Sequence, residues 1–263
     1  DNHSVFGTLV NLGIVGGFGQ NWQQYSVSRF FSFFYQNLIG AYPSVLNMKI
    51  LNLYSGIGGN RKLWGNEHSI TAVEHNAEIA AIYKDLYPND TIIVADAHEY
   101  LLNNFQNFDF IWSSPPCQTH SILNFSSRSR GDGGKFKYPD MRLYQEIVLL
   151  QAFFDGKYCI ENVKGYYEPL INPQESGRHY FWANFKLPNL HFNSKVNNDK
   201  GNNLDKKMAD RGFFISNWHG YKGDKRQLLN NCVEPEIGAA IFKSMQGIYE
   251  DSRIVQQCLF NCG

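Results

Sequence analysis

The sequence predicts an α/β fold, a doubly wound and mainly parallel sheet, on the strength of two observations. From residue 48 onward, short apolar runs alternate with segments of helical periodicity, which is typical of parallel strands joined by helices. Clusters of glycine, proline and polar residues directly follow several of these runs. Ligands of such sheets bind at the carboxyl ends of the strands, near the reversal of strand order. The clusters are therefore candidates for a functional site.

The expected elements follow one another from residue 50. Strands are expected at 50–54, 70–73, 91–94, 108–112 and 157–160, with another at the end of 174–182. A glycine turn and a helix through about residue 63 follow the first strand. Asn76 can cap a helix over 77–86, which Pro88 ends. Apolar residues at helical spacing predict a helix over 141–154, and the polar segment 193–210 predicts a loop.

The composition limits the class of protein. The 263 residues suffice for one domain with a small lobe, and the formal net charge of +0 argues against a histone-like arm while allowing a local basic groove. Five cysteines without regular spacing do not suggest a disulfide framework, and Cys258 and Cys262 lack a second Cys/His pair nearby. No metal site is predicted. No membrane span is predicted, because no run of 18 apolar residues occurs, and residues 1–20 do not have the basic start and apolar stretch that predict a signal peptide.

Residues 1–47 differ in character from the rest. They carry two charged side chains, Asp1 and Arg29, many aromatic residues, and no sustained period of 3.6 or 2. We expect this N-terminal extension to lie outside the main domain, as translated upstream sequence or a cloning remnant before a natural start at Met48. An added interaction lobe is the alternative.

The glycine-rich turn after the first strand predicts a cofactor site. Ser55, Gly56 and Gly58 lie between a strand and a helix, where glycine lets the backbone approach a ligand. Glu74 ends the next strand, where a carboxylate accepts both hydroxyls of a ribose, and Asp96 follows the third strand, where it could accept from an adenine amino group. The trio fits an adenosine-containing cofactor. A packing turn beside two solvated acids is the alternative.

Cys117 is the candidate nucleophile. It follows Pro115 and Pro116, which fix the direction of the chain after the fourth strand. A thiolate is suited to attack an electron-poor ring carbon such as C6 of cytosine. The alternative is a small buried apolar side chain.

Glu161 follows the fifth strand at the same edge of the sheet. A carboxyl group held there, with its pKa raised by burial, can donate to N3 of the ring. Asn162 can hold the loop that carries Cys117, and Arg178 can bind the base carbonyl or a phosphate. The alternative for Glu161 and Asn162 is a turn that caps a helix. The alternative for Arg178 is a solvated surface cation.

A basic, glycine-containing loop follows the nucleophile and is suited to a phosphate backbone, although solvated surface is the alternative. With the neighbouring glutamine, the residues expected to contact nucleic acid are Gln118, Arg128, Arg130, Lys135 and Lys137.

These motifs resemble the cytosine-5 DNA methyltransferases over roughly 48–247. Residues 115–118 match the family's Pro-Pro-Cys-Gln and 161–163 its Glu-Asn-Val. Residues 52–59 are similar to Asp-Leu-Phe-x-Gly-x-Gly-Gly, with Asn52 and Tyr54 as substitutions, and 231–235 resemble Asn-x-Val-x-Pro. Helix 236–245 would then pack beside the glycine turn.

The resemblance implies a Rossmann-like methyltransferase fold that uses S-adenosyl-L-methionine. It makes Cys117 the attacking thiolate and Glu161 its partner at N3, with Asn162 and Arg178 beside them. The residues implied to hold the cofactor are Tyr54, Ser55, Gly56, Gly58, Glu74, Asp96, Pro115, Asn231 and Val233.

The chain departs from the family in two places. The Gln-x-Arg-x-Arg motif reads Gln174-x-Ser176-x-Arg178, with one arginine missing, and only about 40 residues separate Phe185 from Arg226. The resemblance therefore implies a cofactor-binding and catalytic core at 48–185 and a short target-recognition region at 186–226. A returning helix at 227–250 and a tail at 251–263 follow.

The sequence thus predicts transfer of a methyl group to C5 of cytosine in double-stranded DNA, through a covalent bond between Cys117 and C6. A monomeric, cytoplasmic protein of bacterial or viral origin is expected, with restriction-modification, self-protection beside a nuclease and viral genome marking as the open alternatives for its role. The same reaction on tRNA is one alternative, and a non-catalytic protein that binds the cofactor or nucleic acid is another. A nicotinamide oxidoreductase would leave Pro-Pro-Cys-Gln unexplained.

Overall fold

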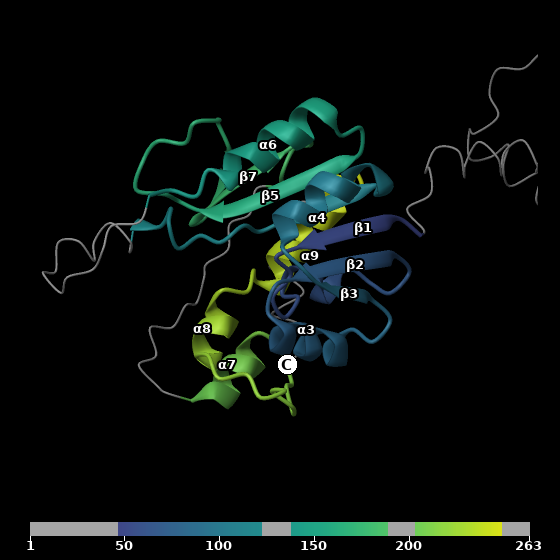
Figure 1. The fold of residues 1–263 in the computed structure, drawn as a ribbon, viewed down its shortest axis with the longest axis vertical. Coiled ribbons are helices and arrows are strands. Elements are labelled where there is room, and N and C mark those ends of the chain that lie inside the picture. The colour runs from purple at the N-terminus through teal and green to yellow at the C-terminus, as the bar shows by residue number, and fades with distance from the viewer. Residues whose placement is uncertain (1–46, 123–137, 189–202, 249–263) are drawn as a thin grey trace, which may run out of the picture. The chain divides into compact units, whose positions relative to one another are not determined.

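A seven-stranded sheet organises the part of the chain that the structure describes. The structure is a computed structural model and describes residues 47–122, 138–188 and 203–248 (Figure 1). The strands are β1 (Lys49–Leu53), β2 (Ser69–Glu74), β3 (Thr91–Val94), β4 (Phe110–Ser113), β5 (Lys157–Val163), β6 (Gln174–Ser176) and β7 (His179–Ala183). They lie in the order β3-β2-β1-β4-β5-β7-β6. Strands β1 to β5 pair in parallel, whereas β7 pairs antiparallel with both β5 and β6, which confirms the predicted mainly parallel sheet.

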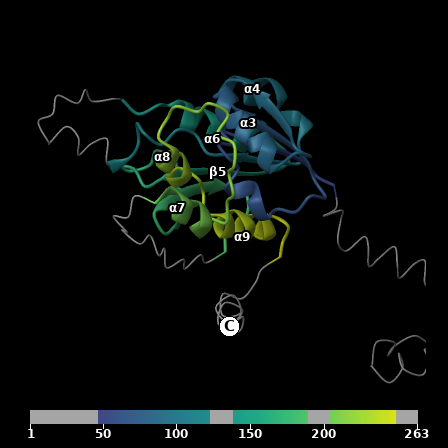
Figure 2. The same ribbon diagram turned by 90° about the horizontal axis from the view of Figure 1, so that it is seen from below.

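Helices cover both faces of this sheet because successive strand residues point to opposite sides. The helices are α3 (Ala77–Leu86), α4 (Ala97–Asn104), α6 (Arg142–Phe153), α7 (Leu204–Asp210), α8 (Lys225–Asn230) and α9 (Pro235–Met245), with 3₁₀ turns η1 (Asn60–Leu63) and η2 (Phe105–Asn107). On β1, Leu51 and Leu53 pack with α4 and α6, whereas Ile50 packs with α9. Figure 2 shows α4 and α9 on opposite sides of the sheet.

Local signals predicted several elements well. Helix α3 has the predicted bounds, and the Asn76 side chain accepts from the Ile79 amide at 2.8 Å. Helix α6 lies within the predicted 141–154, and α9 begins one residue before the predicted 236. Helix α4, capped by Asp96, was not predicted.

Three predictions need correction. The helix expected through about residue 63 is the short 3₁₀ turn η1. Strand β5 continues to Val163, so Glu161 lies inside the strand and not after it, because antiparallel pairing with β7 extends the ladder. The predicted loop at 193–210 is wrong for 204–210, which form α7; Asn203 caps this helix by accepting from two amides. Residues 193–202 lie outside the described residues.

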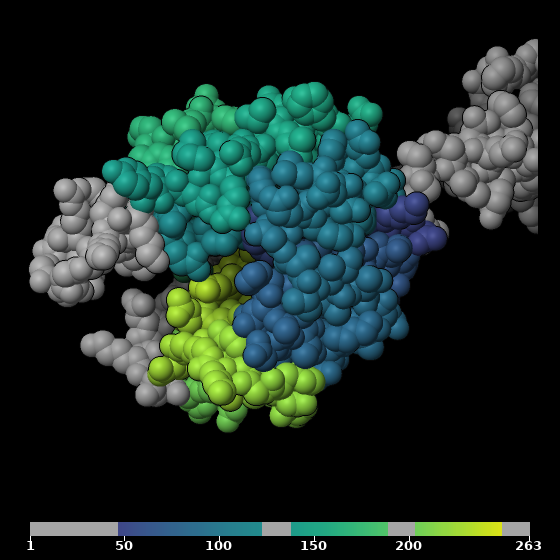
Figure 3. Space-filling model, viewed as in Figure 1, coloured from purple at the N-terminus to yellow at the C-terminus, as the bar shows by residue number. Residues whose placement is uncertain are grey.

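The short region before α9 packs on α3 and on the glycine turn that follows β1. Phe213 and Ile215, with Leu228 and Leu229 of α8, form one apolar cluster with Ile57 of the glycine turn and Ile82 of α3. Figure 3 shows the yellow-green surface of this region directly against the blue surface of the N-terminal half of the sheet. Part of the predicted recognition region therefore covers α3 and the turn.

A buried ion pair holds η1 in place. Arg61 Nε and Nη2 donate to the two carboxylate oxygens of Asp90 at 2.9 and 3.0 Å, and the Tyr83 hydroxyl donates to Asp90 at 2.8 Å. Both charged side chains are 3% exposed. Since neither charge reaches water, each depends on the other.

We expect Asp90→Asn to lower the free energy of unfolding by roughly 3–5 kcal/mol, because it leaves the Arg61 charge buried without its partner. Urea unfolding measures the change. The matched control is Glu175→Gln, which breaks the exposed Lys164–Glu175 pair of 2.7 Å and should change stability by less than about 1 kcal/mol. Equal effects of the two variants would contradict the prediction.

Candidate active site

The glycine turn after β1 takes the left-handed backbone that its sequence allows. Tyr54, Gly56 and Gly58 have φ values of 53°, 53° and 75°. At Gly58 any side chain would collide with the rings of Tyr87 and Tyr83, whereas the space beside Gly56 is open. The turn is thus tightly packed on one side and accessible on the other, as a ligand-binding turn requires.

Glu74 and Asp96 lie beside this turn with their carboxylates oriented by backbone amides. Glu74 accepts from the Gly56 amide at 3.0 Å and from the Asn76 amide at 2.9 Å. Asp96 caps α4 through one oxygen, and its other oxygen lies 3.4 Å from Arg142 Nη1. Each carboxylate retains accepting capacity, since an oxygen has two lone pairs.

The turn also holds a polar atom that fits a cofactor. The Ser55 hydroxyl is buried and has no hydrogen-bond partner among the described residues. Buried polar atoms are normally paired, so this hydroxyl, the open side of Gly56 and the two carboxylates fit a ligand with ribose and adenine groups.

The segment after β4 carries Cys117 on a backbone held from two sides. Asn162 Nδ2 donates to the Pro115 carbonyl at 3.0 Å, the kind of contact predicted for Asn162. The Cys117 carbonyl accepts from the amides of His120 and Ser121, both at 3.0 Å. Burial, followed by the charge of Glu161, raises the pKa of the Cys117 thiol, and Arg178 opposes this shift.

Glu161 is buried on the α9 side of β5 and holds its proton unusually well. Burial raises the pKa of Glu161 to about 7, and Glu234 adds to the shift while Ser114 and Arg178 oppose it. His179 Nε2 lies 3.6 Å from Glu161 Oε1, but burial lowers the pKa of His179 to about 4. The two side chains are therefore not both charged at any pH between these values, and they do not form an ion pair.

Arg178 and the residues before α9 border this part of the site. Arg178 is exposed, and its guanidinium lies 3.3 Å from Glu234 Oε1. The Val233 carbonyl leaves no room for a side chain at Gly59, and Trp64 Nε1 donates to the Gly238 carbonyl at 3.1 Å. The predicted packing of the last helix beside the glycine turn is confirmed.

Of the remaining predicted site residues, two are described and exposed, and four lie outside the described residues. Asn231 and Gln118 are exposed. The four basic residues predicted to contact nucleic acid lie outside the described residues: Arg128, Arg130, Lys135 and Lys137. Among the described residues, no three His, Cys, Asp or Glu side chains gather closely enough to hold a metal ion, and no helix is long and apolar enough to cross a membrane.

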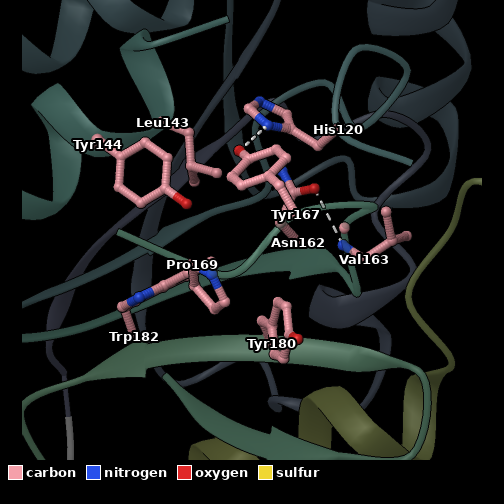
Figure 4. A pocket seen from close by; sticks show the side chains of 10 residues that line it. His120, Leu143, Tyr144, Asn162, Val163, Tyr167, Pro169, Tyr180 and Trp182 are labelled. Carbon is pink, nitrogen blue, oxygen red and sulfur yellow. Dashed lines mark hydrogen bonds between the residues drawn. The ribbon is translucent and has the colours of Figure 1, made fainter. Parts of the chain in front are cut away.

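Sequence reasoning missed the small pocket on the other side of β5 (Figure 4). Tyr144, Tyr167, Tyr180 and Trp182 form part of its lining, and His120 Nδ1 lies 2.6 Å from the Tyr167 hydroxyl. Asn162 faces this pocket, whereas Glu161 faces the α9 side. The sequence also gave no sign of Glu146, a fully buried acid on α6.

The strand order, the antiparallel β7 and the glycine turn define a Rossmann-like fold of the S-adenosylmethionine-dependent methyltransferases. Residues 48–169 match the family model described as C-5 cytosine-specific DNA methylase, which is the family that the motifs of the sequence resemble. The match supports S-adenosyl-L-methionine as the cofactor.

Several solved structures also match the chain, each over about half of its length or less and at a TM-score of 0.35 or below. DNMT2 from Spodoptera frugiperda is 29% identical, with 45% of this chain and 36% of that chain covered at a TM-score of 0.32. A SAM-dependent methyltransferase from Agrobacterium tumefaciens is 14% identical, with 52% and 45% covered at 0.35. A putative DNA modification methyltransferase from an Escherichia coli prophage is 20% identical, with 46% and 33% covered at 0.30. The chain thus spans less than half the length of these proteins. No curated protein matches it.

The raised pKa of Glu161 predicts a pH-dependent stability. Between about pH 4.5 and 7 the folded protein keeps the Glu161 proton that the unfolded chain releases, so stability falls as pH rises through this window. We expect wild type to lose about 3 kcal/mol relative to Glu161→Gln across it. Urea unfolding of both proteins from pH 4.5 to 8 measures the difference. A constant difference across the window would show that Glu161 ionises normally.

Proposed function

We propose that the protein transfers a methyl group from S-adenosyl-L-methionine to C5 of cytosine in DNA, through a covalent bond between Cys117 Sγ and C6. The observation that carries this proposal is the placement of Cys117 after β4 and of a buried, proton-holding Glu161 on the adjoining strand β5. The two are close enough for the charge of Glu161 to raise the pKa of the Cys117 thiol. Nucleophilic addition to the ring needs a proton or hydrogen bond at N3, which such a carboxyl group supplies.

The proposed reaction starts with attack of the Cys117 thiolate on C6. The electron pair of the C5–C6 double bond moves toward C5, while Glu161 donates its proton to N3. When bound, S-adenosyl-L-methionine supplies the methyl group that C5 takes up. A base then removes the C5 proton, the electron pair of the C5–H bond re-forms the C5–C6 double bond, and the C6–S bond breaks with its electron pair returning to sulfur. N3 gives its proton back to Glu161, which is then protonated for the next turnover.

The other site residues hold the reactants in this scheme. Glu74 would bind the ribose hydroxyls and Asp96 the adenine amino group, with the Ser55 hydroxyl and the open side of Gly56 between them. Asn231 and Val233 would complete that pocket. Asn162 fixes the Pro115 carbonyl at 3.0 Å, which keeps the segment before the nucleophile in place.

We further propose that the target base leaves the duplex to reach Cys117, since the reacting carbons are shielded within stacked DNA. Arg178 would bind the base, and the basic loop after Cys117, with Gln118, would contact the backbone. The recognition region is short and packs partly on α3, so few of its side chains can read base edges. We therefore expect little sequence selectivity.

Methyl transfer from labelled S-adenosyl-L-methionine to unmethylated duplex DNA and to tRNA tests the substrate. We expect label on DNA with wild type and none with Cys117→Ser, because the serine hydroxyl is a far weaker nucleophile than a thiolate at neutral pH. Label on tRNA alone would move the assignment to the tRNA reaction. No label on either, with cofactor bound, would favour a non-catalytic protein.

Duplex DNA containing 5-fluorocytosine tests the covalent step, because fluorine at C5 cannot leave as a proton and the adduct persists. We expect a denaturation-resistant protein–DNA band with wild type and none with Cys117→Ser. Cys159→Ala removes a different cysteine, which is fully buried, and should keep the band. Glu161→Gln should form it about 10²–10⁴ times more slowly. A band with Cys117→Ser would exclude Cys117 as the nucleophile.

A further inference from the structure

Glu146 of α6 is a buried carboxylate that the proposed reaction leaves without a role. It has no exposed surface, yet it meets three polar side chains. The Tyr54 hydroxyl donates to it at 2.6 Å and the Ser113 hydroxyl at 2.7 Å, and His98 Nδ1 lies 3.1 Å away. A buried carboxylate is tolerated only where hydrogen bonds replace its lost hydration, and these contacts meet that need.

The three partners share one property, which is their position next to a functional segment. Tyr54 directly precedes Ser55 and Gly56 of the glycine turn, which is the proposed cofactor site and is called the cofactor turn below. Ser113 is the last residue of β4, two positions before Pro115, and His98 lies two positions after Asp96. One carboxylate on a helix thus connects three segments at the carboxyl edge of the sheet.

The backbone of Tyr54 shows what the contact holds in place. Its φ of 53° lies in the left-handed region, which a bulky side chain enters only when its surroundings force it. Burial, and then the charge of Glu146, raise the pKa of Tyr54, so the hydroxyl keeps its proton and donates. The hydrogen bond therefore fixes the tyrosine that opens the cofactor turn.

We propose that Glu146 is a positioning residue that aligns the cofactor turn with the nucleophile segment, each through its own hydrogen bond. This inference rests on the proposed methyl transfer for its kinetic consequences. A merely structural role would lower the melting temperature and leave the kinetics of the folded protein unchanged. With a positioning role, each hydrogen bond affects a different kinetic constant. Loss of the Tyr54 contact weakens cofactor affinity, and loss of the Ser113 contact lowers kcat.

Single-group variants of the full chain test this separation. Tyr54→Phe removes only the hydroxyl, and phenylalanine stands at this place in the family's common motif, so it fits the space. We expect about a 10-fold higher KM for S-adenosyl-L-methionine with kcat changed less than twofold. For Ser113→Ala we expect the reverse, about a 10-fold lower kcat with little change in KM. Glu146→Gln keeps the volume but replaces an acceptor with a donor, and should show both effects.

Tyr144→Phe is the matched control on the same helix. Tyr144 is buried, and its hydroxyl accepts from the Leu170 amide at 3.2 Å and is not one of the three groups that contact Glu146, so the variant should lower stability and keep KM and kcat within twofold. Rates are normalised to folded protein, well below each melting temperature. If Tyr54→Phe and Glu146→Gln change stability alone, as Tyr144→Phe does, Glu146 is structural and the proposal is overturned.

Calorimetry with S-adenosyl-L-methionine separates this proposal from the proposed function. If wild type transfers no methyl group to DNA or tRNA, the proposed function fails, but cofactor binding still tests Glu146. We then expect Kd about 10-fold higher in Tyr54→Phe and Glu146→Gln and unchanged in Ser113→Ala. Equal Kd values in all four proteins would overturn the inference independently of any activity.

Discussion

Four neighbouring parallel strands, β2, β1, β4 and β5, end at one edge of the sheet, and the places of the glycine turn, Glu74, Cys117 and Glu161 depend on that alignment. Their register places Val73, Leu53, Ser113 and Ile160 in one line across the sheet. Whatever follows these positions must emerge at the same edge. The glycine turn, the segment with Cys117 and the buried Glu161 are therefore neighbours in space, although more than a hundred residues separate the first from the last.

Successive side chains of β5 point to opposite faces of the sheet, so the two faces have different roles at this edge. Glu161 points toward α9, where burial holds its proton, while Asn162 points toward α6 and reaches the Pro115 carbonyl. Ser113 at the end of β4 also points toward α6 and meets Glu146. The α6 side thus fixes the backbone, and the α9 side carries the acid, so a shift of one residue in strand register would exchange the two roles.

The sequence predicts what local chemistry determines and misses what distant contacts determine. Helix α3 was predicted correctly because its cap at Asn76 and its end near Pro88 lie within the helix's own neighbourhood. Strand β5 was predicted too short, since Glu161 is polar and only the pairing with β7 buries it. Glu146 looked like one polar position on an amphipathic helix. Its burial depends on donors up to 92 residues away along the chain, which no local pattern reveals.

The protonation of Glu161 and the ionisation of Cys117 favour each other. The charge of Glu161 is one reason that the pKa of the Cys117 thiol is raised. Once Glu161 takes up a proton, that repulsion disappears and only burial, opposed by Arg178, still resists the thiolate. The proposed reaction needs both the thiolate and the protonated carboxyl group at the same moment. Since burial raises the pKa of Glu161 to about 7, much of the protein at neutral pH already holds the proton, and the thiolate forms beside a neutral neighbour.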